Sequence, residues 1–339
     1  MRCTPSALLI ALLSLGACTD MPTGGRSLPP LAEPTATYFV PGYVGNPVPL
    51  EVASAMNASG AIVGRGGTPT VALHRAGTVL RTLASPGRAY TWYAAYDINA
   101  GGAIVGVART AGGQPAAVYW ASATATATII PNTLGGVTSV AHAINDAGTV
   151  VGWATTAAGV RRAYRWTAGS GMVDLGAAPA GIHTEAYGIS NTGWVTGYRI
   201  EGSTDAPFRT SPTGVSTTIK LDARTGAMSI ADDGTAALTN AQLWTVAGAL
   251  VSPFPGLSTL RRVSSQARGV GTVSRPLKTG GTIETAAVSH QGVLTLLTQP
   301  AAANSWAMDV DRCGNVLTLE QLVTGNFRSL LWLRTACDP

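Results

Sequence analysis

Charged side chains are scarce in this chain of 339 residues, in which Asp, Glu, Lys and Arg together make up only 12%. The formal net charge of +5 comes mainly from arginines that are scattered along the chain, without a long basic run. A distribution of this kind lacks the clustered positive charge with which proteins bind nucleic acid. We therefore expect no nucleic-acid partner.

Catalytic and cofactor motifs are missing from the sequence. It contains no His-Glu-x-x-His, no Gly-x-Ser-x-Gly, no phosphate-binding loop and no Asp-box of the sialidase kind. The four histidines do not cluster, and His74 and His142 fall in expected strands, where we interpret them as structural residues. The acidic turns at Asp146 and Asp232 lack the series of oxygen ligands that a calcium loop needs. The sequence thus predicts neither a metal site nor a cofactor.

A repeated unit is what the sequence has in abundance, and its clearest copy is AINDAGTVVGW at 143–153. In seven copies an apolar residue precedes a position that is polar in six of them. A glycine follows three residues later in six copies, and an alanine stands four residues earlier in six. A period of this length is typical of propellers and solenoids. The seven positions, 33 to 47 residues apart, are Asn57, Asn99, Asn145, Ser190, Ala231, Ser264 and Asp311.

Each copy is interpreted as a hairpin, in which an Ala-x-x-Ile strand turns through Asn-x-x-Gly into a Val-Val-Gly strand. Asn, Asp and Ser hydrogen-bond to their own backbone, and Gly accepts the positive φ of such turns. A third apolar segment ends in Trp in four of the seven copies, and a fourth segment follows, most clearly at 169–176 and 290–297. Four short strands in about 40 to 45 residues are typical of a propeller blade.

This pattern resembles the bacterial extracellular repeats named for a His-Ala-Phe triplet, in which A-x-x-I-N-x-x-G-x-V-V-G precedes H-A-F-x-W and D-L-G segments. The resemblance covers nearly all of the chain from Thr37 onward, although the triplet itself is altered, and its nearest copy is Arg162-Ala163-Tyr164. It implies a repetitive β-structure outside the cytoplasm and brings no catalytic residues with it.

The expected fold class is all-β, a β-propeller of seven blades with four antiparallel strands each. Residues 37–40 precede the first copy like a strand without a blade, whereas the seventh copy ends at its third strand, at 329–333. The N-terminal strand is therefore expected to complete the last blade and close the ring, which leaves no open sheet edge between the chain ends. Residues 37–339 then form a single propeller domain.

Residues 1–18 have the features of a secretory signal, with Arg2, an apolar run at 7–15 and Leu-Gly-Ala-Cys ending at Cys18. The last four residues resemble the lipobox of bacterial lipoproteins, which implies cleavage before Cys18 and a lipid anchor on it. The alternative is an ordinary signal with an incidental cysteine. Thr19 follows the cysteine, which by the usual sorting pattern implies the outer membrane, with the domain facing the periplasm or the cell surface. Residues 19–36, rich in proline, are expected to form a flexible tether.

Four cysteines are present in all. Because Cys3 belongs to the signal and Cys18 carries lipid, Cys313 and Cys337 remain as the pair in an oxidising compartment. A disulfide between them is favoured over a metal site, since two cysteines alone do not complete a coordination shell.

A binding site is expected in the loops that lead from the fourth strand of one copy to the first strand of the next, because these loops gather at one mouth of a propeller. They carry aromatic residues beside a few polar groups, which suits carbohydrate or peptide binding. The alternative is that the aromatic residues cap the blade ends as part of the core. The candidates are Tyr43, Tyr90, Trp92, Tyr93, His183, Glu185, Asp222, Arg224 and Trp306.

Two function classes follow. The first is a surface or periplasmic lipoprotein whose propeller acts as a non-catalytic binding or scaffold module for a protein or carbohydrate ligand. The second is an extracytoplasmic hydrolase or lyase that acts on polysaccharide or peptide at the central mouth. The first is favoured because candidates for acid, base and nucleophile are few, and two carboxylates at the spacing of a glycosidase pair would reverse this preference.

Overall fold

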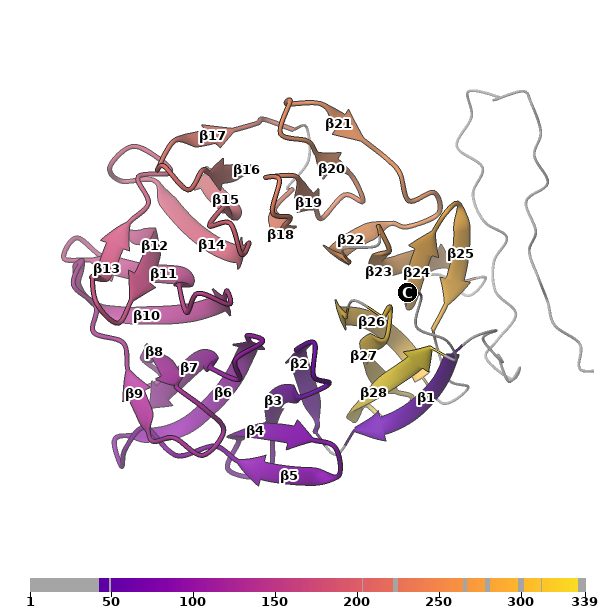
Figure 1. Ribbon diagram of the computed structural model, residues 1–339, viewed down its shortest axis with the longest axis horizontal. Helices are drawn as coiled ribbons and strands as arrows, with labels where there is room; N and C mark the ends of the chain where they lie inside the picture. The colour runs from indigo at the N-terminus through magenta and orange to yellow at the C-terminus, as the bar shows by residue number, and fades with distance from the viewer. Residues whose placement is uncertain are drawn as a thin grey trace, which may run out of the picture.

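A computed structural model of the protein describes residues 43–334, except 49, 203, 222–224, 265–266, 278–280, 298–301 and 312. In these residues the chain forms 28 β-strands, which make seven antiparallel sheets of four strands each. The sheets are arranged in a ring (Figure 1). The fold is a seven-bladed β-propeller, as the repeats predict. Within the described residues, no helix is long and apolar enough to cross a membrane.

Six blades are meanders in which the strands follow one another in chain order. Blade 1 contains β2 (Val52–Met56), β3 (Ile62–Gly66), β4 (Val71–Ala76) and β5 (Val79–Thr82). Blade 2 contains β6 (Tyr90–Ile98), β7 (Ile104–Thr110), β8 (Pro115–Trp120) and β9 (Ala127–Ile129). Blade 3 contains β10 (Gly135–Ile144), β11 (Val150–Thr156), β12 (Arg161–Thr167) and β13 (Gly171–Asp174).

The second half of the ring repeats this order. Blade 4 contains β14 (His183–Ile189), β15 (Val195–Glu201), β16 (Thr204–Thr210) and β17 (Ser216–Thr218). Blade 5 contains β18 (Ala227–Ile230), β19 (Ala236–Leu238), β20 (Leu243–Trp244) and β21 (Leu250–Val251). Blade 6 contains β22 (Thr259–Val263), β23 (Gly269–Pro276), β24 (Thr282–His290) and β25 (Val293–Leu296). Blade 7 contains β26 (Ala302–Val310), β27 (Val316–Leu322), β28 (Phe327–Arg334) and, as its outer strand, β1 (Tyr43–Val48).

The N-terminal strand closes the ring. Strand β1 pairs antiparallel with β28, in a register that runs from Tyr43 opposite Arg334 to Val48 opposite Ser329. This confirms the expected closure, but the strand is formed at 43–48, whereas the expected strand at 37–40 lies outside the described residues. The segment directly before the first copy reaches β28, so Tyr43 belongs to this outer strand and not to a loop at the mouth.

The hydrophobic core lies between neighbouring blades. The side chain of Trp120 at the end of β8 is fully buried with Val63 of blade 1, and its indole N–H donates to the Ala84 main-chain oxygen at 2.9 Å. Similar clusters join blade 2 to blade 3 and blade 7 to blade 1. Each blade therefore depends on its neighbours for the burial of its apolar faces.

The first strand of every blade contains a β-bulge at the same place in the repeat. In β6, Ala95 lies opposite Gly106 and Asp97 opposite Val105, so Tyr96 between them has no partner across the ladder. The same shift of register follows Ala53, Ala141, Ala186, Ala227, Leu260 and Ala307. A bulge inserts one extra residue and re-aims its side chain. The two unspecified positions of the Ala-x-x-Ile motif are thus the bulge and the residue after it.

The bulge explains the second glycine of the repeat. A Cβ at Gly106 would overlap the main-chain oxygen of Ala94 on the bulged strand. The same overlap would occur at Gly64, Gly152, Gly197 and Gly271. Glycine is found where another backbone approaches closely. The Val-Val-Gly segment therefore ends in glycine because of the strand beside it.

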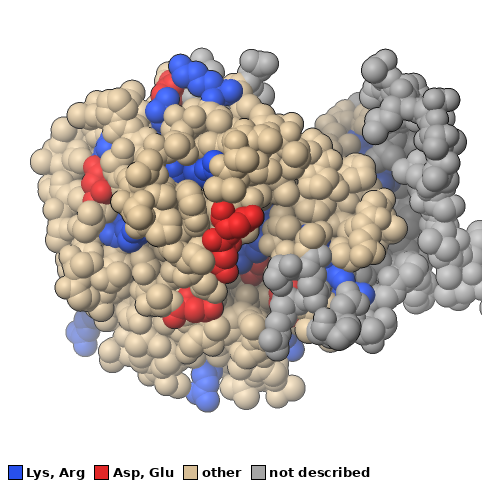
Figure 2. Space-filling model, turned by 45° about the horizontal axis from the view of Figure 1, so that its top comes forward, with Lys and Arg blue, Asp and Glu red and all other residues tan. Residues whose placement is uncertain are grey.

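On the face drawn in Figure 2, the charge is distributed in small groups of both signs. Figure 2 shows Lys and Arg side chains and Asp and Glu side chains as separate patches on an otherwise uncharged face. This agrees with the low content of charged residues in the sequence. The face that is drawn carries no continuous field of one sign.

Candidate functional site

The seven bulges meet around one central pocket. Each blade contributes its bulge residue to the wall of a cavity of about 300 Å³. Six of these seven residues are half-buried and one, Arg261, is exposed, whereas the alanine or leucine before each is buried. The bulge thus turns one side chain per blade out of the sheet and into the centre of the ring. The seven residues are Ser54, Tyr96, His142, Tyr187, Met228, Arg261 and Met308.

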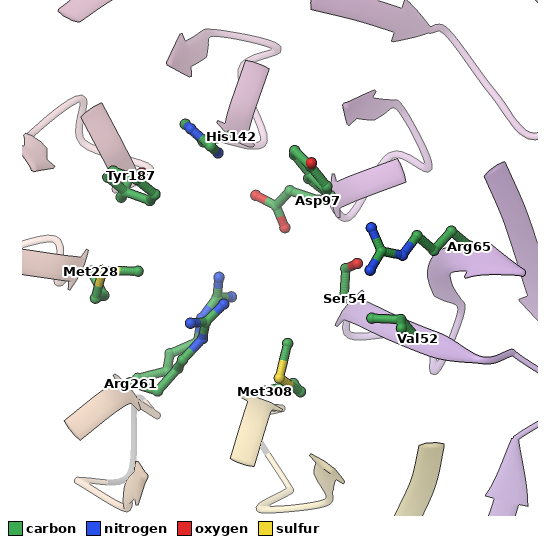
Figure 3. A pocket seen from close by; sticks show the side chains of 11 residues that line it. Val52, Ser54, Arg65, Asp97, His142, Tyr187, Met228, Arg261 and Met308 are labelled. Carbon is green, nitrogen blue, oxygen red and sulfur yellow. The ribbon is translucent and has the colours of Figure 1, made fainter. Parts of the chain in front are cut away.

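One side of the pocket is aromatic. The rings of Tyr96 and His142 stack with their centroids 5.8 Å apart, and those of His142 and Tyr187 stack at 4.3 Å. Tyr198 continues the stack behind Tyr187 at 5.3 Å. Burial lowers the pKa of His142 to about 4, so its imidazole is neutral near pH 7. Three consecutive blades therefore form a continuous uncharged wall (Figure 3).

The other side of the pocket combines thioethers and guanidinium groups. Met228 and Met308 flank Arg261, and Arg65 reaches the pocket from blade 1, as Figure 3 shows. The Arg65 guanidinium also lies 5.6 Å from the ring centroid of Trp92. The pocket thus presents apolar and cationic groups side by side.

An ionic cluster with two buried carboxylates and a partly exposed arginine lies deeper in the channel. Asp97 and Arg262 line both the central pocket and a second cavity of about 360 Å³ that extends toward the turns after the first strands. The guanidinium of Arg262 bonds to a carboxylate oxygen of Asp309 at 3.0 Å. Burial raises the pKa of Asp97 to about 6, and the positive charge of Arg262 opposes this rise.

The two carboxylates of this cluster also join blades. The Asp97 carboxylate accepts hydrogen bonds from its neighbour Ile98 N–H and from Ile144 N–H of blade 3, both at 3.0 Å. Asp309 accepts from Met56 N–H of blade 1 at 2.9 Å in the same way. Both residues follow the bulge directly, so in two of the seven copies the second unspecified position of the repeat carries a carboxylate that joins two blades at the inner end of the pocket.

The structure places the predicted site residues in strands and not in loops. Tyr90, Trp92 and Tyr93 belong to β6, His183 and Glu185 to β14, and Trp306 to β26. The reason is that these first strands begin before the repeat motif and continue their pairing with the second strand, as Tyr90 does with Thr110 and His183 with Ile200. None of the six is among the residues that line the central pocket. Asp222 and Arg224 lie outside the described residues.

Several of these aromatic residues are structural. Tyr93 is 8% exposed and belongs to the core between blades 1 and 2, and Tyr90 packs against the same cluster. Trp306 contacts Phe327 of its own blade, with ring centroids 6.5 Å apart. The ring centroid of Trp92 lies 5.6 Å from the guanidinium group of Arg65 and 5.5 Å from that of Arg109. Through Arg65, Trp92 is connected to the pocket.

His183 and Glu185 meet at one arginine. The His183 Nδ1 atom accepts from the main-chain N–H of Arg161 at 3.1 Å, and the Glu185 carboxylate pairs with the Arg161 guanidinium. Glu185 is 3% exposed and accepts from the hydroxyl group of Tyr187 at 2.8 Å. Glu185 therefore lies behind the aromatic wall and positions Tyr187. The residue predicted from the sequence supports a lining residue of the pocket but does not line the pocket itself.

The residues that do line the pocket were missed at the sequence level. His142 was assigned a structural role, but the bulge in β10 turns it into the channel. A signal was present, because the residue after the motif alanine varies from serine to arginine between copies, while the residue before it and the apolar residue two positions after it are nearly constant. A position that varies inside a repeated motif indicates a surface that the fold does not constrain.

The ring and its central pocket define this protein as a seven-bladed β-propeller. No family model matches the chain, and no curated protein matches it. Among solved structures it is similar to one from a study of two prolyl endopeptidases, with 10% identity and a TM-score of 0.57 over 87% of this chain and 50% of that one. The chain thus spans half the length of that protein, and the likeness concerns the fold alone.

Two further structures are similar at a lower level. TolB from Acinetobacter baumannii has 12% identity and a TM-score of 0.43, over 68% of this chain and 63% of that one. AofleA from Arthrobotrys oligospora has 11% identity and a TM-score of 0.38, over 78% of this chain and 93% of that one.

Proposed function

We propose that this protein is a non-catalytic binding module that receives a protein or carbohydrate ligand at its central pocket. One observation carries the proposal: all seven blades direct their bulge residue into the same cavity, and these residues differ in chemistry although the motif around them repeats. Closure of the ring alone does not require such variety. Pockets that bind ligands are concave and combine apolar surface with a small number of polar groups. This one combines two methionines and an aromatic wall with three arginines and Asp97.

The position of these residues supports the proposal. They lie on paired strands near the axis of the ring, and not on long loops, so their main chain is held by the ladder on both sides of the bulge. Binding residues on rigid elements are held more precisely than those on loops. A ligand would therefore meet a surface that is already in place.

A hydrolase at the mouth is the less favoured alternative. Among the described residues that line the central pocket, Asp97 is the one carboxylate. Both of its oxygens accept main-chain hydrogen bonds. A second carboxylate at glycosidase spacing would have favoured hydrolysis, and no such pair lines the described part of the pocket.

The test is to fill the pocket. Met228→Trp adds bulk to its wall, and Val293→Trp on the exposed outer strand β25 is the matched control. Wild type and both variants, checked by thermal melting, are applied to one array of glycans and one of peptides. We expect wild type and Val293→Trp to bind the same subset and Met228→Trp to lose it. If nothing binds, or if the subset survives Met228→Trp, the pocket is not the binding site.

We also propose that the propeller is an outer-membrane lipoprotein held through Cys18, facing the periplasm or the cell surface. The proposal rests on the Leu-Gly-Ala-Cys sequence that ends at this cysteine. Residues 1–36 lie outside the described residues. Replacement of Cys18 by Ser should move the protein from the detergent phase to the aqueous phase, and an unchanged partition would reject the anchor.

A further inference from the structure

Two arginines of the central pocket lack an acidic partner in the described part of the chain. Arg262 is paired with Asp309, but no ion pair joins Arg65 or Arg261 to a carboxylate among the described residues. Both side chains reach toward the interior of the pocket, from blades 1 and 6 (Figure 3). The pocket therefore holds two guanidinium groups without a direct ion pair among the described residues, although the Asp309 carboxylate acts on Arg261 from a greater distance.

Arg261 is exposed inside the ring, but its surroundings disfavour an unpaired positive charge. The protein around the recess lowers the pKa of Arg261, the adjacent Arg262 lowers it further, and the Asp309 carboxylate opposes this shift. Two like charges close together disfavour the charged form of each group. An anion in the pocket would offset this repulsion, because a guanidinium group presents several N–H donors that match a carboxylate.

The groups around the arginines limit what else the ligand carries. Met228 and Met308 stand beside Arg261, and the wall formed by Tyr96, His142 and Tyr187 is uncharged. Methionine adapts its shape to apolar groups of different outline. Asp97 lines the same pocket and would repel a second negative charge. A singly charged group next to an apolar one fits this combination.

We propose, on the basis of the proposed binding function, that the pocket recognises a free carboxylate attached to an apolar group, with Arg261 and Arg65 as its anion-binding residues. The cavity of about 300 Å³ and the cluster of Asp97, Arg262 and Asp309 at its inner end suit a ligand that enters end-on. Two sources supply this chemistry, the C-terminus of a peptide and a small organic acid.

The experiment compares acids with their amides. Isothermal titration calorimetry measures N-acetyl-L-phenylalanine against N-acetyl-L-phenylalaninamide, and an eight-residue peptide ending in Phe with a free against an amidated C-terminus. We expect each acid to bind about tenfold or more tightly than its amide, because a charge-assisted hydrogen bond is lost with the carboxylate. Arg261→Gln and Arg65→Gln should remove this difference. Arg81→Gln, on the exposed outer strand of blade 1, should keep it.

The outcomes separate the two proposals. Equal affinity for acids and amides, or a preference that survives both Arg261→Gln and Arg65→Gln, overturns carboxylate recognition. If neither acid binds while array ligands are still lost in Met228→Trp, the binding function stands and this inference fails. Stronger competition by inorganic phosphate than by acetate would also reject carboxylate recognition.

The same titrations identify the source of the carboxylate. Tighter binding of the peptide acid than of the N-acetyl amino acid supports the proposal and identifies the C-terminus of a peptide as the ligand. Equal affinity of the two acids supports the proposal with a small organic acid as the ligand.

Discussion

The side-chain amide of Asn99 donates a hydrogen bond to the main-chain oxygen of Asn145, 3.0 Å away at the same position of the next blade. Asn57 donates to Asn99, and Asn145 to Ser190, over the same distance. The amide oxygen of Asn99 meanwhile accepts from Ala103 N–H of its own turn at 2.9 Å. One side chain thus closes a turn and joins two blades. This dual role needs a donor and an acceptor, which asparagine supplies and aspartate or serine cannot supply in the same geometry.

Loss of the Asn99 side chain should destabilise the ring. Asn99→Ala leaves the buried Ala103 N–H without its partner and removes one of the two hydrogen bonds of the Asn145 oxygen, which still accepts from Gly148 N–H, so we expect the free energy of unfolding to fall by about 1 to 3 kcal/mol. Asn240→Ala, at an exposed turn, is the matched control and should change it by less than about 0.5 kcal/mol. Urea denaturation measures both. Equal effects of the two substitutions would show that the bond between blades contributes nothing.

The close approach at the bulge predicts a second effect. Gly106→Ala places a methyl group against the Ala94 main-chain oxygen, which a flexible side chain cannot relieve. Overpacking of this kind typically destabilises by about 1 to 3 kcal/mol, and we expect the upper end because backbone must move. Gly169→Ala, where a Cβ meets no neighbour within 4 Å, should be nearly neutral. Thermal melting of both variants decides the matter, and a neutral Gly106→Ala would contradict the account of the repeat glycine.

The fold could be predicted from the sequence because each copy of the repeat carries the same strand and turn signals. Even the copy with the shortest interval, from Ala231 to Ser264, forms a blade, although β20 and β21 are reduced to two residues each. The exceptional Ala267, which stands where other copies have glycine, also adopts a positive φ, of 55°. Neighbouring blades impose the turn where the local sequence does not favour it.

The lining of the pocket was harder to predict for a geometric reason. Alternation along a strand assigns Tyr187 and His142 to a face of the sheet, but a bulge breaks that alternation and re-aims the side chain. The mark that the sequence does carry is indirect: it is the repeat glycine of the neighbouring strand, such as Gly152 or Gly197, which faces the bulged strand. Glu185 was selected as a polar residue in a loop expected at the mouth, and its contact with Tyr187 requires the fold to be known.

The proposed disulfide between Cys313 and Cys337 would fasten the closing blade. Cys313 lies in the turn between β26 and β27, and the main-chain N–H of Arg334, at the end of β28, donates to the Asn315 side chain of that turn at 2.8 Å. Cys337 follows three residues later and lies outside the described residues. Cα atoms within about 7 Å can be bridged. In an entropic account the bond contributes roughly 3 to 4 kcal/mol to the free energy of unfolding.

Mass spectrometry of unreduced peptides tests this bond directly, and free alkylation of both thiols in protein taken from the periplasm or cell surface would rule it out. Cys337→Ser should lower the free energy of unfolding in the absence of reductant. Under reducing conditions the variant and wild type should be equally stable.

Asp97 and His142 are expected to give opposite pH dependences of stability. Burial raises the pKa of Asp97 from 3.8 to about 6, so between these values the folded protein holds a proton that the unfolded chain has lost. The contribution of Asp97 to stability therefore falls as pH rises from about 4 to 6. Burial also raises the pKa of Asp309, which adds to this fall. His142 acts in the other direction, because its pKa is lowered from 6.5 to about 4. The unfolded chain then binds the extra proton, and this contribution rises with pH over about 4 to 6.5.

Each of the two pKa shifts corresponds to roughly 3 kcal/mol of stability. Because the two contributions change in opposite directions with pH, they largely cancel in wild type. Together they should change the free energy of unfolding little between pH 4.5 and 6.5. Substitution separates them. Asp97→Asn removes a falling contribution, and its stability should rise with pH relative to wild type. His142→Gln removes the rising contribution, and its stability should fall with pH relative to wild type. Urea denaturation at several pH values measures the slopes, and the double variant should return to the slope of wild type. If the stability of both single variants changes with pH in parallel with wild type, the pKa of neither group differs between the folded and unfolded states. The pocket is then more hydrated than its lining implies.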